Sequence, residues 1–251
     1  EWSEHYRYTC QEPNFTPVAI YDEDKWLVSG QKFDKNGSLT EDLDTNSLYA
    51  YDPKTREFSD VIYHDETYDV GGFTGGCRGA GSIRADLDEN TSTLRSLTYT
   101  AAGPKTLYFD DNVVEDEVDE KSDDIKFSSR QLGESLQSLF PNDWVSIITK
   151  DNNNTKGVFA VTNSNNPGDY FYFDLTKGQV LMLYQNSPWL DRDNLSKKEV
   201  VTYTARDGLP ITAYLSKTLK ETNRNYFIIL PHGGPNVKQY HGYDGWVQFL
   251  T

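Results

Sequence analysis

The chain is short of basic residues. Its 251 residues include 24 Lys and Arg against 39 Asp and Glu, which gives a formal net charge of −15. Nucleic-acid-binding proteins need basic patches that neutralise phosphates, and an acidic surface would repel nucleic acids, acidic partners and anionic membrane surfaces. We therefore expect no nucleic acid and no membrane among its partners.

Cysteine and long apolar runs are also scarce. Cys10 and Cys77 are the two cysteines of the sequence, which permit one disulfide, while His5 and His64 are isolated and no ligands stand at metal spacing. We expect two structural thiols rather than a zinc site, and no cofactor. No run reaches the ~18 apolar residues of a membrane span. The compartment stays open between cytoplasmic and periplasmic or secreted.

The chain is poor in aliphatic residues and rich in aromatic ones. Hydrophobic residues make up 36% of the chain, yet aromatics reach 14% with 17 Tyr. A tyrosine-rich, aliphatic-poor composition suits many short, half-exposed strands better than a helical bundle. The length allows one or two domains. We therefore expect a mainly β protein.

Short apolar runs alternate with polar turns along the first two thirds of the chain. A four-stranded antiparallel unit every ~40–50 residues is typical of a propeller blade. In one such unit all four strands are predicted, and a helix with a leucine stripe, stopped by Pro141, precedes it. Strands are expected at 26–31, 47–51, 60–63, 94–100, 105–109, 144–149, 158–162, 170–173 and 180–184, and the helix at 129–140.

Two segments of unusual composition each have a structural and a functional interpretation. The glycine-rich segment 71–81 resembles a phosphate-binding loop, but no Lys-Ser/Thr follows it, so an inter-strand loop is the better account. The segment 113–126 holds seven acidic residues, but it lacks the central glycine of a calcium loop. We expect a solvated surface segment there, with attraction of cations or cationic peptides as the alternative.

The most informative stretch is 226–235, an apolar run followed by His232, Gly233, Gly234 and Pro235. Residues 227–230 are apolar, consecutive and bounded by breakers, which predicts a buried strand. Adjacent glycines let the backbone approach a ligand closely. An HGG-type tract after the third strand of an α/β-hydrolase supplies a backbone N–H to the oxyanion hole. Upstream, strands at 200–203 and 209–215 joined by an Asp-Gly turn predict a hairpin.

These runs, taken together, resemble the propeller-to-hydrolase junction of the prolyl oligopeptidase family, and most closely its acylaminoacyl peptidase and dipeptidyl-peptidase-like branch. The resemblance implies the C-terminal blades of a β-propeller in 1–195, followed by the first strands of an α/β-hydrolase domain in 196–251. It is carried by residues 48–52 with Thr55, 167–174 with Gly178, 189–191, 201–209, 214–215, 231–235 and 248–250.

The departure from the family is a missing nucleophile. No G-x-S-x-G elbow occurs in the sequence, because Ser82 and Ser135 stand in the wrong register relative to their glycines. The catalytic Ser, Asp and His are therefore expected outside these residues, and the chain is expected to be inactive alone. By resemblance, the N–H of Gly234 is the oxyanion donor and Gly233 permits the turn. His232 is expected to fix the loop.

The resemblance implies an enzyme that hydrolyses short peptides through an acyl-enzyme, with the propeller restricting entry. An esterase-type hydrolase is one alternative, because such enzymes share the HGG tract. A non-catalytic propeller that binds partners and keeps a vestigial hydrolase part is the other. A short peptide is the expected partner, and a homo-oligomer stays open.

Overall fold

The structure is a computed structural model that describes residues 12–22, 24–41, 43–71, 82–110, 125–220, 226–233 and 239–251. Its described part consists mainly of antiparallel β-sheets, which confirms the predicted fold class. The chain divides into two compact units. The first comprises Glu1–Asp110 with Pro231–Gln239, and the second comprises Asp111–Leu230 with Tyr240–Thr251.

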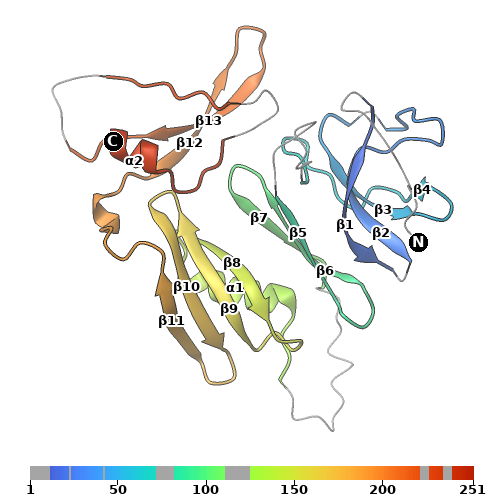
Figure 1. The fold of residues 1–251 in the computed structure, drawn as a ribbon, viewed down its shortest axis with the longest axis horizontal. Helices are drawn as coiled ribbons and strands as arrows, with labels where there is room; N and C mark the ends of the chain where they lie inside the picture. Colours follow the sequence, from blue (N-terminus) through green and yellow to red (C-terminus); the bar gives the residue numbers. More distant parts are fainter. Residues whose placement is uncertain are drawn as a thin grey trace, which may run out of the picture. The chain divides into compact units, whose positions relative to one another are not determined.

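The first unit contains a four-stranded meander in the order β1-β2-β3-β4 (Figure 1). The predicted strands at 26–31 and 47–51 are present as β2 and β3. The edge strand β1 was not predicted, because Pro17 interrupts its apolar pattern; an edge strand tolerates a residue that cannot donate to the ladder. The strands are β1 (Phe15–Tyr21), β2 (Lys25–Gly30), β3 (Ser47–Asp52) and β4 (Glu57–Phe58).

The strand predicted at 60–63 is wrong. The fourth strand is instead β4, and Tyr63 forms only an isolated bridge with Leu48. Ser59 explains the interruption: its hydroxyl accepts the N–H of Ala50 at 3.0 Å and donates to the carbonyl of Asp60 at 2.6 Å. A side chain that bonds to the main chain in this way competes with the strand ladder.

A three-stranded sheet completes the first unit, in the order β5-β6-β7. The predicted strands at 94–100 and 105–109 are present as β6 and β7, whereas β5 was not predicted. Leu97 and Tyr99 of β6 pack with Leu27 and Leu48 in one buried cluster. The strands are β5 (Ile83–Leu87), β6 (Leu94–Thr100) and β7 (Pro104–Tyr108).

The second unit is built on a four-stranded meander in the order β11-β10-β9-β8, and all four of its strands were predicted. The predicted helix is present as α1 (Ser129–Leu139) and begins with a capping box between Ser128 and Gln131, which satisfies two main-chain donors. The strands are β8 (Trp144–Lys150), β9 (Lys156–Asn163), β10 (Asn166–Asp174) and β11 (Gln179–Gln185).

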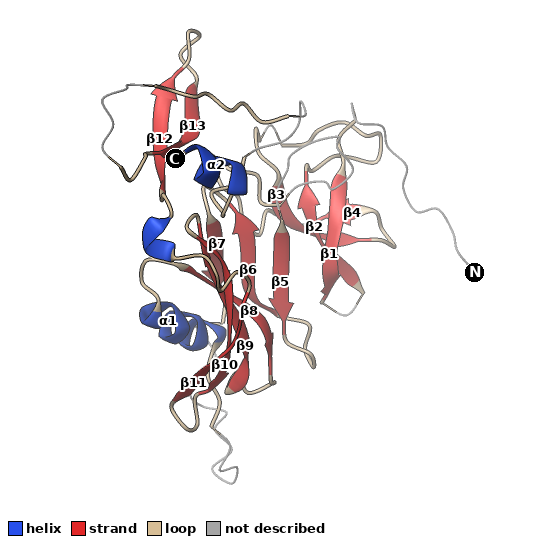
Figure 2. Cartoon of the chain, turned by 60° about the vertical axis from the view of Figure 1, so that its left-hand side comes forward, coloured by secondary structure: helices blue, strands red, loops and turns tan. Residues whose placement is uncertain are grey.

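The helix α1 covers one face of this sheet (Figure 2). Leu132 and Leu136 are one turn apart, so they lie on the same side of the helix, and both are fully buried. Leu139, the third residue of the predicted stripe, is 54% exposed. The buried leucines pack against Phe159, Val161, Phe171 and Phe173.

The remaining elements of the second unit follow the sheet in the sequence. After the short 3-10 helix η2 (Arg192–Asn194), strands β12 (Lys198–Thr204) and β13 (Pro210–Ser216) form the predicted hairpin. Gly208 lies in its turn with a φ of +92°, a conformation that glycine adopts without steric cost. The last helix, α2 (Gly245–Leu250), is capped by the side chain of Asp244.

The blade assignment and the domain boundary stay predictions. Within the described ranges, each sheet is separate and no strand of one pairs with a strand of another. The predicted boundary near Ser196 lies inside the second unit. Most of the glycine-rich segment and most of the acidic segment lie outside the described residues.

Candidate functional site

The predicted oxyanion-hole loop is described in part. His232 and Gly233 are exposed, and Gly234 lies outside the described residues. His232 Nδ1 lies 2.9 Å from the carbonyl oxygen of Gly233, so the tautomer with a proton on Nδ1 can donate to it. This contact links the histidine ring to its own loop. The role of Gly234 as a donor stays a prediction.

The apolar run before this loop is not a buried strand, contrary to the prediction. Residues 226–230 have no regular secondary structure, and their side chains are between 56% and 78% exposed. A buried strand in a parallel sheet requires neighbours that satisfy its main-chain groups and cover both faces. Among the described strands, none pairs with this run.

The structure instead shows a cluster of buried and half-buried polar residues, here called the junction cluster, where the β8–β11 sheet meets the hairpin and α2. Its members are Ser164, Ser196, Lys198, His241 and Gln248. Lys198 is only 7% exposed, and its Nζ donates to the carbonyls of Tyr240 at 3.3 Å and Gly242 at 2.8 Å. Burial lowers the pKa of this ammonium, although the charge of Asp244 opposes the shift.

His241 occupies the centre of the junction cluster. Its Nε2 donates to the carbonyl of Lys198 at 2.9 Å, and its ring meets the rings of Trp144 and Tyr214 edge-on, with centroids 4.7 Å and 5.3 Å away. Burial lowers the pKa of His241, and the nearby ammonium of Lys198 lowers it further, while the hydrogen bond to the Lys198 carbonyl acts the other way. The net effect lowers the pKa and favours the neutral imidazole.

Gln248 of α2 links the sheet to the segment before β12. Its Nε2 donates to the carbonyls of Ser164 at 3.0 Å and Ser196 at 2.8 Å, and its Oε1 accepts the N–H of Ser196 at 2.8 Å. Ser164 also accepts the N–H of Lys198 on its hydroxyl at 2.9 Å. One amide side chain thus joins three parts of the second unit.

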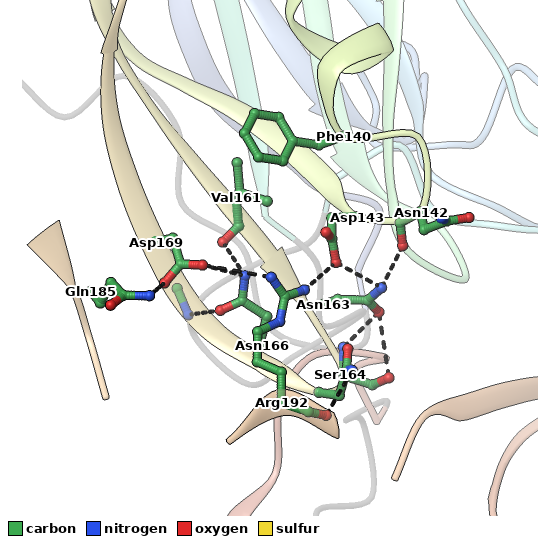
Figure 3. A network of polar contacts seen from close by, with 12 residues as sticks. Phe140, Asn142, Asp143, Val161, Asn163, Ser164, Asn166, Asp169, Gln185 and Arg192 are labelled. Atoms are coloured by element: carbon green, nitrogen blue, oxygen red, sulfur yellow. Dashed lines mark hydrogen bonds and ion pairs between the residues drawn. The ribbon is translucent and has the colours of Figure 1, made fainter. Parts of the chain in front are cut away.

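A second polar group, the turn network, lies next to the junction cluster and surrounds the β9–β10 turn (Figure 3). Arg192 bridges two carboxylates, with Asp143 at 2.8 Å and Asp169 at 3.7 Å. Asn163 donates to Asp143 at 3.2 Å and Asn166 to Asp169 at 3.1 Å. A buried polar group is stable only when it is bonded, and these contacts bond Asn163 and Asn166 of the turn that presents Ser164 to Lys198.

The junction cluster has the chemistry of a structural joint rather than of a catalytic centre. A catalytic triad needs a hydroxyl bonded to a histidine nitrogen that is itself oriented by an acid. Within the described ranges, His241 Nδ1 is buried and bonds to no group, and the Ser164 hydroxyl accepts a main-chain N–H. The contacts of His241 and Asp244 are structural: His241 bonds to the carbonyl of Lys198, and Asp244 caps α2.

A serine–histidine contact also occurs in the first unit, where Ser47 Oγ lies 2.9 Å from His64 Nδ1. Ser47 is fully buried, and Thr45 lies 3.4 Å from the same nitrogen. A nucleophile must reach its substrate. This contact therefore fastens the start of β3 and does not offer a nucleophile.

Asp65, Tyr63, Tyr99 and Lys105 form a further polar cluster in the first unit. Asp65 accepts from Tyr99 at 2.5 Å and from Lys105 at 3.0 Å, and Tyr63 lies 3.1 Å from the Tyr99 hydroxyl. Burial alone would raise the pKa of Asp65, but the hydrogen bonds from Tyr99 and its other donors hold it well below the usual range. Through these bonds the Asp65 carboxylate joins β6 and β7 to the loop after β4.

Metal ligands and membrane helices are absent from the part of the chain that the structure describes. No group of three or more His, Cys, Asp and Glu side chains could hold a metal ion there. No helix in the same part is long and apolar enough to cross a membrane.

No sequence pattern indicates the junction cluster, apart from its place between the two predicted parts. Lys198 is the first residue of a strand with exposed neighbours, a position that normally carries a solvated lysine. Its carbonyl partners follow 42 and 44 residues later. Burial of this lysine depends on how the chain returns, and no local pattern records that.

Comparison with known proteins gives a weak sequence match. No family model matches the sequence. Dipeptidyl aminopeptidase BIII of Pseudoxanthomonas mexicana is 26% identical over 126 residues, a match that covers 47% of this chain and 18% of that enzyme. The chain therefore spans about a fifth of the length of this relative.

Solved structures of similar proteins include a prolyl endopeptidase, with a TM-score of 0.39 and 11% identity over 84% of this chain and 25% of the other. Prolyl oligopeptidase B from Galerina marginata has a TM-score of 0.41 and 11% identity over 80% of this chain and 23% of the other. At these TM-scores, structural likeness supports no functional assignment.

Proposed function

We propose that this chain is part of a serine peptidase that hydrolyses short peptides in the manner of a dipeptidyl or acylaminoacyl peptidase. The observation that carries the proposal is an order of elements: a four-stranded sheet, a hairpin, His-Gly-Gly-Pro, and a helix whose Gln248 bonds back to the sheet. This order is expected where a propeller passes into an α/β-hydrolase domain. The match to a dipeptidyl aminopeptidase supports the same assignment.

In the proposed reaction, a serine attacks the scissile carbonyl and a tetrahedral oxyanion forms before the acyl-enzyme. The N–H of Gly234 donates to that oxyanion, and Gly233 lets the loop turn towards it. Loss of one such donor typically costs about 2.7–4 kcal/mol of transition-state stabilisation. The serine, its acid and its histidine are assigned to other parts of a longer protein.

The β8–β11 sheet is proposed to be the last blade of a propeller that restricts entry to short peptides. Its charged turn network and the junction cluster would join that blade to the hydrolase part. Peptide length is therefore expected to matter, because a narrow entrance admits only short or extended chains. Cleavage rates measured on peptides of increasing length test this gating directly.

The experiment that tests the activity uses the longer protein that we propose contains this chain. It is incubated with matched short peptides that have free or acylated amino termini, and the products are identified by mass spectrometry. Release of amino-terminal dipeptides or of acylated amino acids, abolished by a serine-hydrolase inhibitor, supports the proposal. Intact peptides of both kinds would contradict it.

Two other functions predict different results in the same experiment. An esterase would hydrolyse acyl esters and leave the peptides intact. A non-catalytic propeller would hydrolyse neither substrate, although it could bind a peptide. Ester substrates and a peptide-binding measurement therefore accompany the peptide panel.

A further inference from the structure

Strand β11 (Gln179–Gln185) forms one edge of the four-stranded sheet in the second unit (Figure 1). Its inner side pairs with β10, and none of the described strands pairs with its outer side. The main-chain groups along such an edge are a template for pairing with another chain. The outer side of β11 is therefore a candidate interaction surface.

The side chains of this strand are apolar and open to solvent. Four consecutive residues are between 53% and 58% exposed, namely Leu181, Met182, Leu183 and Tyr184. An exposed apolar edge strand promotes association, and a contiguous exposed apolar patch commonly marks an interface. A partner that covers this edge would therefore be stabilised by apolar burial as well as by main-chain hydrogen bonds.

Strand β11 has few of the features that protect natural sheet edges. Charged residues and proline, which discourage edge pairing, are both absent from its sequence. A bulge is present, with Leu183 as the extra residue opposite β10, and the register is regular from Gln179 to Met182. The lack of charge also matters because the chain has a net charge of −15. Two copies would repel each other least where they meet through an uncharged strand.

The sequence of β11 reads almost the same in both directions. Counted outward from Met182, leucine matches leucine, valine matches tyrosine, and glutamine matches glutamine. Two copies paired antiparallel about Met182 would therefore set apolar side chains opposite apolar ones and amides opposite amides. A twofold interface uses the same patch on both subunits, so it requires this kind of self-complementary strand.

We propose that β11 pairs antiparallel with β11 of a second copy of this chain, with Met182 on the twofold axis. The two four-stranded sheets then form one continuous sheet. One strand from each copy makes a small interface, so we expect a dissociation constant of roughly micromolar order. The pairing needs no enzymatic activity and does not depend on the proposed peptidase.

Cysteine cross-linking tests the register of this pairing. Cα atoms directly opposite each other in an antiparallel pair are ~4.5–5.5 Å apart, a separation that a disulfide spans. Met182→Cys is therefore expected to give a covalent dimer when diamide oxidises the two thiols, with the linked peptides identified by mass spectrometry. Gln179→Cys is the control, because residue 179 would lie ~20 Å from its copy. The wild type, which has Cys10 and Cys77, gives the background.

An added charge tests the strength of the pairing. Met182→Lys sets two ammonium groups opposite each other across the axis, where like charges are destabilising. Gln179→Lys adds the same charge at the end of the strand. The dissociation constant from sedimentation equilibrium is expected to rise by roughly tenfold in Met182→Lys and to stay within about threefold of the wild type in Gln179→Lys. Circular dichroism shows whether both variants fold.

Both experiments use the 251-residue chain and the longer protein. Covalent dimers of Met182→Cys in both, without dimers of Gln179→Cys, support the pairing. Dimers in the chain alone would mean that another part of the longer protein covers β11, which overturns it. Equal cross-linking at the two positions, or a dissociation constant unchanged by Met182→Lys, also overturns it. A longer protein that dimerises but cleaves no peptide contradicts the proposed function alone.

Discussion

Lys198 and His241 hold each other from opposite ends. His241 donates from Nε2 to the main-chain carbonyl of Lys198, and the Lys198 ammonium donates to the carbonyls immediately before and after His241. Each side chain therefore donates hydrogen bonds to the main chain at or beside the other residue. This reciprocal contact joins the first residue of β12 to the segment that leads into α2.

Acidification is expected to weaken this contact. Burial lowers the pKa of His241, whereas in the unfolded chain it titrates near its ordinary value of ~6.5. Between the two pKa values the unfolded state binds more protons than the folded state. The contribution of His241 to the free energy of unfolding is therefore complete above a pH of ~6.5 and is lost as the pH falls through the pKa of the folded state. The free energy of unfolding in urea, measured at pH 8 and pH 5, reports the loss.

The variant His241→Phe keeps a ring between Trp144 and Tyr214 but cannot take a proton. It is expected to lose about 0.5–1.5 kcal/mol at pH 8 with the hydrogen bond, and to show a smaller difference between the two pH values. His232→Phe, at an exposed histidine, is the control and should retain the wild-type difference. Equal pH dependence in His241→Phe and the wild type would refute this role.

Replacement of Gln248 by an acid is expected to destabilise the protein. Its amide nitrogen donates to the carbonyls of Ser164 and Ser196, and the nearly isosteric Gln248→Glu would set a carboxylate oxygen against both. We expect a loss of about 1–3 kcal/mol in the free energy of unfolding at neutral pH. Gln179→Glu, on the exposed start of β11, should change it little. Equal stability of the two variants would mean that the amide does not join sheet and helix.

Two leucines of α1 offer a test of the second unit's core. Leu136→Ala removes a fully buried side chain and is expected to cost about 2–5 kcal/mol, because a cavity is left against the sheet. Leu139→Ala changes a side chain that is 54% exposed and should cost far less. Chemical unfolding of both variants checks the packing. Similar losses would place both leucines in the core and contradict this arrangement.

Local patterns predicted the elements that depend on local causes. The sheet β8–β11, α1 and the β12–β13 hairpin follow from apolar runs, a leucine stripe stopped by Pro141 and an Asp-Gly turn. The strand predicted at 60–63 is absent because the hydroxyl of Ser59 accepts the main-chain N–H of Ala50, which a strand ladder would otherwise use. Such a competition leaves no trace in hydrophobic periodicity.

The junction cluster could not be predicted for a different reason. Gln248 bonds to Ser164, 84 residues earlier in the chain, and neither residue belongs to a pattern that specifies burial. Conversely, the run 227–230 has the pattern of a buried strand, yet burial requires neighbouring strands on both sides. An apolar run indicates that a segment is able to form a buried strand. Whether the strand forms and is buried depends on neighbouring strands from the rest of the molecule.

The N–H of Gly234 can be removed without adding a side chain. Replacement of Gly234 by glycolic acid turns the amide into an ester, which has no hydrogen to donate. In the longer enzyme we expect kcat to fall by roughly 100- to 1,000-fold with little change in KM, the usual effect of losing one oxyanion donor. The same replacement at Gly208, in the β12–β13 turn, is the control. Unchanged kcat on peptide substrates would remove Gly234 from the reaction.

The central proposal is that this chain is part of a serine peptidase whose nucleophile lies elsewhere in a longer protein. Labelling with a fluorophosphonate probe tests it most directly, with the 251-residue chain and the longer protein treated side by side and their intact masses measured. We predict one adduct on the longer protein and none on the chain. A longer protein that stays unlabelled, under conditions that label a control hydrolase, would contradict the account.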